Sequence, residues 1–234
     1  MRRGRCLGLV GGLGIGATVY YYGKLARAHE AQERGLELVI THAQISRVFE
    51  YVQADDRSGM AEYLAGHIRR MQAAGAEVAA IPAVTPHFCI AELMAISPLP
   101  VVTMFEPLLE ELRARAARRI AIFGTRFVVE SSLFGQLPDV EVIKGRPEEM
   151  DYIHNTYVEL ARTGKASEGQ HAHLTALAHK LVERDRVDMI LLAGTDLTLL
   201  FDDSNTDFPH IDCAALHLGA ILKHLLDDPP PKRH

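Results

Sequence analysis

Tryptophan is absent from the sequence, cysteine occurs only three times, and basic residues are outnumbered by acidic ones. The three cysteines are too few and too scattered for a disulfide framework or a zinc site, which favours a reducing compartment. With 25 Lys and Arg against 30 Asp and Glu, the chain lacks the basic surface typical of nucleic-acid binding. A hydrophobic fraction of 48% excludes a disordered protein.

Long apolar runs are also missing. No segment reaches the roughly 20 apolar residues that a membrane-spanning helix needs. The opening MRRGRC is basic, as in a signal peptide, but the apolar residues that follow are interrupted by glycines and lead into a charged helix. We therefore expect a soluble cytoplasmic protein with no membrane partner.

What the sequence does contain is a series of short apolar runs. Runs of this kind are typical of buried parallel strands, and segments of helical periodicity separate them. The predicted strands are Leu7–Gly11, Leu36–Ile40, Glu77–Pro82, Pro100–Met104, Arg119–Gly124, Val140–Lys144, Asp188–Ala193 and Pro209–Asp212. Alternation of strand and helix predicts an α/β protein with parallel sheets.

Two segments show the helical pattern clearly. Residues 58–74 place Met60, Leu64, Ile68 and Met71 on one face, with arginine and histidine on the other. Residues 170–185 place Leu174, Leu177, Ala178 and Leu181 on one stripe.

An internal repeat divides the chain into similar halves. About 70 residues separate the first strand from the third, and the fifth from the seventh. The repeat predicts two pseudo-symmetric, Rossmann-like α/β domains with parallel four-stranded sheets, residues 1–104 plus 214–234 and residues 105–213. Open α/β sheets bind ligands at the carboxyl ends of their strands, so we expect an active-site cleft between the halves.

Loops rich in glycine and threonine follow four of the predicted strands. They are Gly11–Thr18, Ala83–His87, Gly124–Phe127 and Ala193–Leu197. Such residues at a strand-to-helix turn expose N–H groups and hydroxyls that suit a small anion. The first loop reads G-G-x-G-x-G, which is not the dinucleotide fingerprint, and no phosphate-binding G-x-x-x-x-G-K-[ST] occurs.

Seven segments in order resemble the aspartate/glutamate racemase superfamily, the cofactor-independent amino-acid racemases. They are LGLVGGLGIGATVYYYGKL, DDRSGMAEYL, AGAEVAAIPAVTPH, IAIFGTRFVVES, IHNTYVELARTGK, VDMILLAGTDLTLL and IDCAALH. The resemblance covers essentially the whole chain. It implies two α/β domains with the active site between them and a chemistry that needs neither pyridoxal phosphate nor a metal.

The resemblance also implies a departure from the family mechanism. Members racemise with two cysteines, one on each side of the substrate α-carbon. At the matching positions this chain has Ala83, in Ala-Val-Thr, and Gly194, in Ala-Gly-Thr-Asp. Neither residue exchanges a proton, so the thiol mechanism cannot operate here.

Other positions keep the family pattern. Arg57 and Lys165 match residues that hold the distal carboxylate of the substrate, and Thr85, Thr125 and Thr195 match those that hold the α-carboxylate. Gly12 and Val84 complete the expected substrate-binding set. Charged donors of this kind favour a dicarboxylate-like ligand. A helix-terminal surface charge is the alternative interpretation of Arg57 and of Lys165.

His87 and Asp196 are the candidate replacements for the cysteines, because imidazole and a desolvated carboxylate both suit proton transfer. A packing or helix-start role is the alternative for His87. Cys89 and Cys213 fit better as small buried residues, although Cys213 follows the last strand and could approach the cleft. His171 and His173 are two residues apart, so a helix directs them to different faces and we expect no metal site.

Three functions remain open. The first is a superfamily enzyme, an isomerase or lyase, that acts on a small carboxylate by non-thiol chemistry. The second is a binding or regulatory protein that has kept the pocket and lost catalysis. The third is a racemase whose cysteines were replaced by experiment, which the additional change at Val84 disfavours. The resemblance and the tyrosines at 20–22 also suggest a homodimer.

Overall fold

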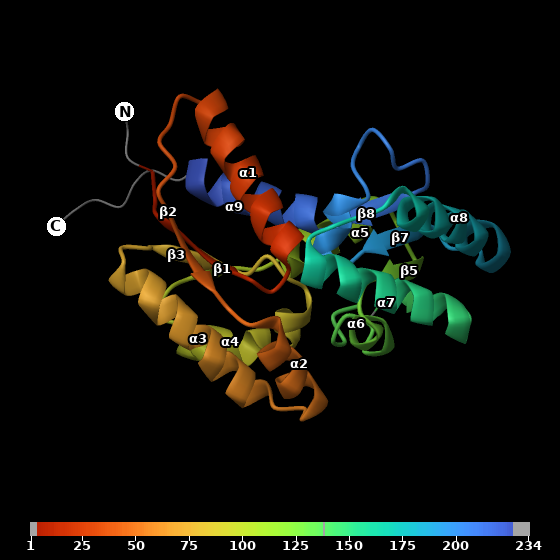
Figure 1. Ribbon diagram of the computed structural model, residues 1–234, viewed down its shortest axis with the longest axis horizontal. Coiled ribbons are helices and arrows are strands. Elements are labelled where there is room, and N and C mark those ends of the chain that lie inside the picture. The colour runs from red at the N-terminus through yellow and green to blue at the C-terminus, as the bar shows by residue number, and fades with distance from the viewer. Residues whose placement is uncertain (1–3, 138, 227–234) are drawn as a thin grey trace. The chain divides into compact units, whose positions relative to one another are not determined.

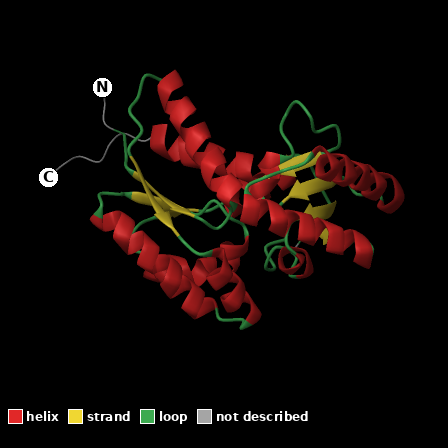
Figure 2. Cartoon of the chain, in the orientation of Figure 1, coloured by secondary structure: helices red, strands yellow, loops and turns green. Residues whose placement is uncertain are grey.

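The computed structural model describes residues 4–137 and 139–226, and these form an α/β protein (Figures 1 and 2). The chain divides into two compact units. The first comprises the residues up to Leu13, Thr18–Thr103 and the residues from His217, and the second comprises Gly14–Ala17 and Met104–Leu216. Residues 1–3 and 227–234, which the predicted first half includes, lie outside the described residues.

Each unit contains a parallel four-stranded sheet within the described residues, which confirms the predicted fold class. In the first unit the order is β2-β1-β3-β4. The strands are β1 (Leu7–Gly11), β2 (Leu38–His42), β3 (Val78–Ala80) and β4 (Val101–Val102). β1 is buried along its whole length and pairs with both β2 and β3, so it is a central strand of this unit.

The helices of the first unit lie on both sides of this sheet, as Figure 1 shows, with α1 on one side and α3 on the other. They are α1 (Ile15–Ala31), whose first residues group with the second unit, α2 (Ile45–Gln53), α3 (Arg57–Ala73), α4 (Ile90–Ile96) and α9 (Cys213–Leu226), together with the 3₁₀ helix η1 (Thr85–Cys89).

Helix α3 packs on the sheet with the predicted apolar stripe. Met60, Leu64, Ile68 and Met71 are all fully buried. The prediction that histidine lies on the opposite face is wrong, because His67 is only 3% exposed. Its ring lies 5.0 Å from that of Tyr63, one turn earlier, and packing against this ring keeps the imidazole out of solvent.

The second unit repeats the same topology, with the order β6-β5-β7-β8. Its strands are β5 (Arg119–Phe123), β6 (Glu141–Val142), β7 (Met189–Leu192) and β8 (His210–Asp212). Its helical segments are α5 (Phe105–Ala114), α6 (Arg126–Glu130), α7 (Pro147–Thr163), α8 (Glu168–Asp185) and the 3₁₀ helix η2 (Thr195–Leu199). The predicted stripe of α8, Leu174, Leu177, Ala178 and Leu181, is buried.

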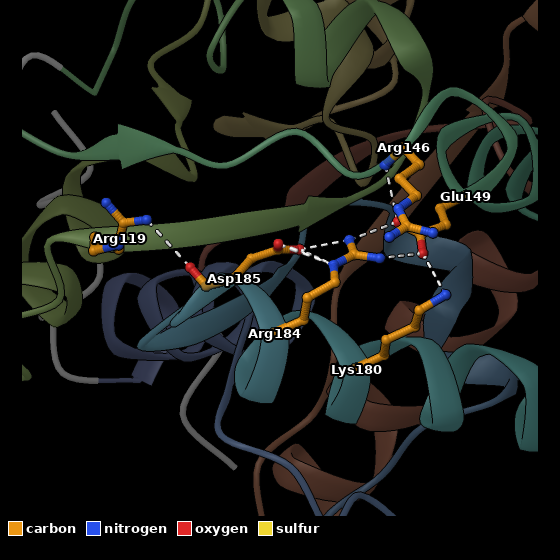
Figure 3. A network of polar contacts seen from close by, with 6 residues as sticks. All are labelled: Arg119, Arg146, Glu149, Lys180, Arg184 and Asp185. Atoms are coloured by element: carbon orange, nitrogen blue, oxygen red, sulfur yellow. Dashed lines mark hydrogen bonds and ion pairs between the residues drawn. The ribbon is translucent and has the colours of Figure 1, made fainter.

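A polar network joins α7 to α8 (Figure 3). Glu149, in the first turn of α7, is only 7% exposed and accepts two hydrogen bonds from Arg184, at 2.8 and 2.9 Å. Lys180 Nζ lies 2.8 Å from the same carboxylate, and the backbone N–H of Arg146 donates to it at 2.8 Å. These donors hold the pKa of Glu149 far below its usual range, so the carboxylate is charged and fully compensated.

One predicted strand is displaced. β2 runs from Leu38 to His42, whereas the apolar run predicted Leu36–Ile40. The ladder with β1 fixes the register, because Leu7 pairs with Leu38 and the Leu7 N–H donates to the Glu37 carbonyl at 2.9 Å. β2 is an edge strand, so its polar end, Thr41 and His42, can continue the ladder without being buried. The other predicted strands each enclose an observed one.

No helix within residues 4–137 and 139–226 is long and apolar enough to cross a membrane.

Candidate functional site

Most of the predicted site residues lie where parallel strands end and the chain turns into a helix, whereas Arg57 begins α3 and Lys165 follows α7. In the first unit the strand-end residues follow β1 and β3, and in the second they follow β5 and β7. Carboxyl ends of parallel strands are the usual place for ligands in α/β folds.

The loop after β3 is entirely buried from Ile81 to Cys89. Ala83, at the position of the first family cysteine, is 2% exposed, and Thr85 begins η1. His87 is 1% exposed, and its Nδ1 lies 2.9 Å from the carbonyl oxygen of Ala83. Burial, and next the neighbouring His217, lower the pKa of His87 to about 3. The imidazole is therefore neutral at pH 7, and its Nδ1–H donates to the Ala83 carbonyl oxygen.

His217 of α9 is a buried neighbour of this loop that the sequence interpretation missed. Its ring centroid lies 6.1 Å from that of His87, and the ring is fully buried. Its Nε2 lies 2.9 Å from the Val102 carbonyl, and its Nδ1 lies 3.1 Å from the hydroxyl of Tyr21. Since Nε2 must donate to the carbonyl, Nδ1 accepts from the phenol. The only sequence signal was its place in the IDCAALH segment.

Arg57, the first residue of α3, lies against this loop. Its guanidinium is 4.0 Å from the centre of the Phe88 ring, and Nη1 donates to the Phe88 carbonyl at 2.8 Å. The structure therefore brings Arg57 to the loop that carries Thr85 and His87. Arg57 is also exposed at the first turn of α3, which keeps the alternative of a helix-terminal surface charge open.

Gly12, after β1, has a conformational role. Its φ of +84° lies in the left-handed region, and a Cβ there would come within 2.4 Å of the Ala43 carbonyl oxygen. Its N–H donates to the hydroxyl of Thr18 at 3.0 Å. This N–H is therefore used within the loop.

In the second unit, Asp196 occupies the space that the glycine-rich loop leaves. Asp196 is fully buried, and its Oδ1 accepts from the N–H of Ala17 at 2.9 Å. A Cβ at Gly14 would lie 1.9 Å from Oδ2, and one at Gly16 would lie 3.0 Å from Oδ1. The helix-start N–H groups predicted to hold a ligand anion hold this carboxylate, so the first loop is not an open anion cradle at that point.

The Asp196 carboxylate is nevertheless poorly compensated. Its Oδ2 has no hydrogen-bond partner among the described residues. Burial raises the pKa of Asp196 to about 6, although hydrogen bonds from the backbone of Ala17 and Gly16 oppose the shift. The group therefore changes charge close to neutral pH.

Tyr157 of α7 is a second residue that the sequence interpretation missed. A Cβ at Gly194 would lie 2.3 Å from its Cε2 and 2.4 Å from its Cδ2. The ring thus fills the place that a side chain at the second family cysteine position would need. Burial raises the pKa of Tyr157 well above its usual range, and a hydrogen bond with Thr195 opposes this shift. The sequence feature that could have identified Tyr157 is its position in the IHNTYVELARTGK segment.

Thr125 is 3% exposed and caps α6, because its Oγ1 accepts from the Val128 N–H at 3.3 Å. A Cβ at Gly124 would lie 2.9 Å from the Ala193 carbonyl oxygen, so the loops after β5 and β7 lie side by side. Lys165 is exposed, just beyond the C-terminal end of α7.

The remaining candidates do not resemble a thiol or metal centre. Cys89 and Cys213 are buried, and burial raises the pKa of Cys89 to about 12 and that of Cys213 higher still. Both are therefore uncharged thiols, the form expected of small buried residues. His173 stacks on Tyr152 and His171 packs against Phe201, so the two rings have different neighbours. No group of three metal-ligating side chains occurs in the described part of the chain.

The model of the Asp/Glu/Hydantoin racemase family matches residues 10–221. No sequence of a curated protein matches closely enough to count as a relative. An aspartate racemase homologue from Pyrococcus horikoshii has a similar structure, with 21% identity, a TM-score of 0.72, and coverage of 94% of this chain and 98% of that chain.

Two further solved structures share the fold. The aspartate racemase of Picrophilus torridus is 17% identical, with a TM-score of 0.74 and coverage of 94% of each chain. An arylmalonate decarboxylase is also 17% identical, with a TM-score of 0.50 and coverage of 92% of this chain and 91% of that chain.

Proposed function

Because the chain belongs to the Asp/Glu/hydantoin racemase family, we propose that it is an enzyme of this superfamily that works without the usual cysteine pair. One observation carries the proposal: the two cysteine positions have lost their thiols, whereas the loops around them keep polar side chains. Ala83 and Gly194 bear no thiol, and the Tyr157 ring fills the space beside Gly194. Hydroxyl, carboxylate and imidazole groups remain in the same loops. The reaction is a non-thiol isomerisation or lyase step on a small dicarboxylate or amino-acid-like substrate.

The carboxylates of this substrate would be bound by hydroxyl and cationic donors. Thr85, Thr125 and Thr195 each stand at the start of a helical turn, where hydroxyl and N–H groups favour an anion. Arg57 and Lys165 would add charged donors for a second carboxylate, which are about twice as strong as neutral ones. Gly12 and Val84 would shape the surrounding loops.

Asp196 is our first candidate for the proton-transferring group. Its pKa of about 6 makes both charge states available near neutral pH, and its Oδ2 has no hydrogen-bond partner in the described residues. As the carboxylate it would accept the α-proton in an isomerisation. As the acid it would deliver a proton to the carbanion left by loss of CO₂. His87, neutral and held by the Ala83 carbonyl, is the second candidate.

A non-catalytic carboxylate-binding protein is the alternative, and two contacts favour it. Arg57 is engaged with Phe88, and Asp196 holds the first turn of α1. Both contacts would persist in a protein that had lost catalysis.

Deuterium incorporation at the α-carbon of L- and D-aspartate and glutamate in D₂O, followed by proton NMR, tests the isomerase reaction. CO₂ release from substituted malonates tests the lyase reaction. We expect the protein to catalyse one of these reactions. The rate of the isomerase reaction should rise as the pH increases through about 6, and the rate of either reaction should fall at least ~100-fold in Asp196→Asn.

Asp212→Asn is the matched control for this experiment. Asp212 is also a strand-end carboxylate that accepts from helix-start N–H groups, those of Ala214 and Ala215 at 2.7 and 3.3 Å. If turnover persists in Asp196→Asn but is lost in His87→Gln, His87 and not Asp196 is the proton-transferring group. Ligand binding with no turnover of any substrate would leave the binding protein as the function.

We further propose that the protein is cytoplasmic, independent of pyridoxal phosphate, and a homodimer. Val19 and Tyr22 on α1 and Ile40 on the edge strand β2 are 65%, 52% and 44% exposed. Exposed apolar residues beside an edge strand are features that a soluble monomer normally avoids, so a second copy of the chain would cover them. Light scattering on Val19→Glu should then report a monomer.

A further inference from the structure

A small cavity of about 250 Å³ lies within the first unit. It is lined by His42, Gln44, Arg47, Tyr63, His67 and Arg70. We call it the His–Arg cavity. Three elements meet there: the end of β2, the start of α2, and the face of α3 on which Tyr63, His67 and Arg70 recur at helical spacing.

Hydrogen bonds and stacking fix the walls of this cavity. The Gln44 N–H donates to the Tyr63 hydroxyl at 2.7 Å, which ties the start of α2 to α3 and leaves the phenol proton available as a donor. The Arg47 guanidinium lies 5.6 Å from the centre of the Tyr63 ring. These contacts hold the donors in place before any ligand arrives, which reduces the entropic cost of binding.

The cavity is cationic because two guanidinium groups line it. Two imidazole rings also border it, and no carboxylate is among the lining residues. Arg70 directs Nε to the Gly66 carbonyl of its own helix at 3.2 Å. Glu50 lies 3.6 Å from Arg47 and is itself 68% exposed, so it neutralises the cavity only from outside. Burial, and next the neighbouring Arg70 and His42, lower the pKa of His67 to about 4.

His67 supplies an independent sign of a missing partner. The residue is 3% exposed, and its Nδ1 is buried with no hydrogen-bond partner among the described residues. A buried polar atom without a partner is costly, and such atoms in native proteins usually meet a water, an ion or a ligand. Here the atom belongs to a ring that borders a cavity large enough for one.

We propose that the His–Arg cavity binds a phosphoryl group, either as free phosphate or on a small molecule. Its donors come from three elements and so approach from several directions, which suits a tetrahedral oxyanion better than a planar carboxylate. Guanidinium groups recognise phosphate through paired N–H donors, and a phosphate dianion balances the two arginines. The ring of His42 also abuts Gly12, so the bound group would lie next to the loop after β1.

The experiment uses the whole protein at pH 7. Calorimetric titrations measure binding of inorganic phosphate and of ribose 5-phosphate, with acetate and chloride as comparison anions. Nitrogen-15 NMR of the histidine side chains follows His42 and His67 directly. We expect phosphate to shift both histidines and to raise the pKa of His67, because an anion stabilises the imidazolium.

Arg70→Gln and Arg69→Gln form a matched pair of variants. Arg69 is the neighbour of Arg70 on α3, but it is bonded to Glu62 at 3.2 Å and is not among the residues that line the cavity. Arg70→Gln should weaken phosphate binding at least ~10-fold, whereas Arg69→Gln should change it less than ~2-fold. Preference for ribose 5-phosphate over free phosphate would identify a phosphorylated small molecule as the ligand, and the reverse would identify phosphate itself.

The proposal is overturned if phosphate leaves His42 and His67 unshifted, or if acetate or chloride binds as tightly. Equal losses in Arg70→Gln and Arg69→Gln would also overturn it, because they would show attraction to general surface charge. Circular dichroism of both variants establishes that the exposed substitutions leave the fold intact.

Discussion

The two units share one strand order but bury opposite kinds of ionisable side chain. Within the described residues, all the buried histidines belong to the first unit: His29, His67, His87 and His217. The buried carboxylates of the described residues belong to the second unit: Glu149 and Asp196. The loops after β3 and β7 repeat this difference, with His87 in one and Asp196 in the other. Topology therefore fixes where these loops lie, while the buried groups decide which charge each loop can carry.

The largest expected difference between the two units is in how their stability changes at acid pH. Burial lowers the pKa of His87 to about 3 and those of His67 and His217 to about 4. The unfolded chain then binds more protons than the folded one below about pH 6.5, so stability is complete above that pH and lost as the pH falls. One such histidine costs on the order of 3 kcal/mol by pH 4, so three together are comparable to the whole stability of a typical domain.

The second unit has one histidine with a lowered pKa, the half-buried His154, and its other shifted groups respond in a different pH range. Glu149, Asp185 and Asp188 have lowered pKa values, so their contribution is lost only below about pH 4.5. Asp196 has a raised pKa, so its burial becomes less costly as the pH falls through 6. Hydrogen exchange measured by mass spectrometry at pH 7, 5.5 and 4.5 should show the first unit losing protection first. Equal loss at the same pH would contradict the contrast between the units.

Sequence patterns anticipated the topology better than the site. Apolar runs and the internal repeat located the strands, because burial on both faces leaves a signal within a few neighbouring residues. They missed the end of β2, since an edge strand carries polar residues without penalty. They could not show that Asp196 meets Ala17 across 179 positions, or that Tyr157 fills the space beside Gly194. Such contacts depend on packing between distant segments, which no local pattern encodes.

Glu149→Gln tests the carboxylate side of the comparison. Removing this charge leaves Arg184 and Lys180 without their shared partner at a site where Glu149 is only 7% exposed. Arg184 keeps Asp185 as a partner at 2.6 Å and Lys180 is half-exposed, so we expect a loss of about 1–2 kcal/mol in the free energy of unfolding, measured by urea denaturation. Glu148→Gln, an exposed change in the same helical turn, should cost less than about 0.5 kcal/mol. Similar losses in the two variants would mean that the network adds little.

Restoring cysteine at the two family positions compares the loops directly. Ala83 already carries a Cβ, so Ala83→Cys adds one sulfur and should cost about 1 kcal/mol. Gly194→Cys must place its Cβ where Tyr157 now lies, 2.3 Å from Cε2, and should cost about 2–3 kcal/mol. Thermal unfolding measures both changes. Gly194→Cys combined with Tyr157→Ala is the informative control, because removal of the ring should accommodate the new side chain. If Gly194→Cys alone is as stable as Ala83→Cys, the Tyr157 ring moves aside at little cost. In that case the ring does not sterically exclude a cysteine at position 194.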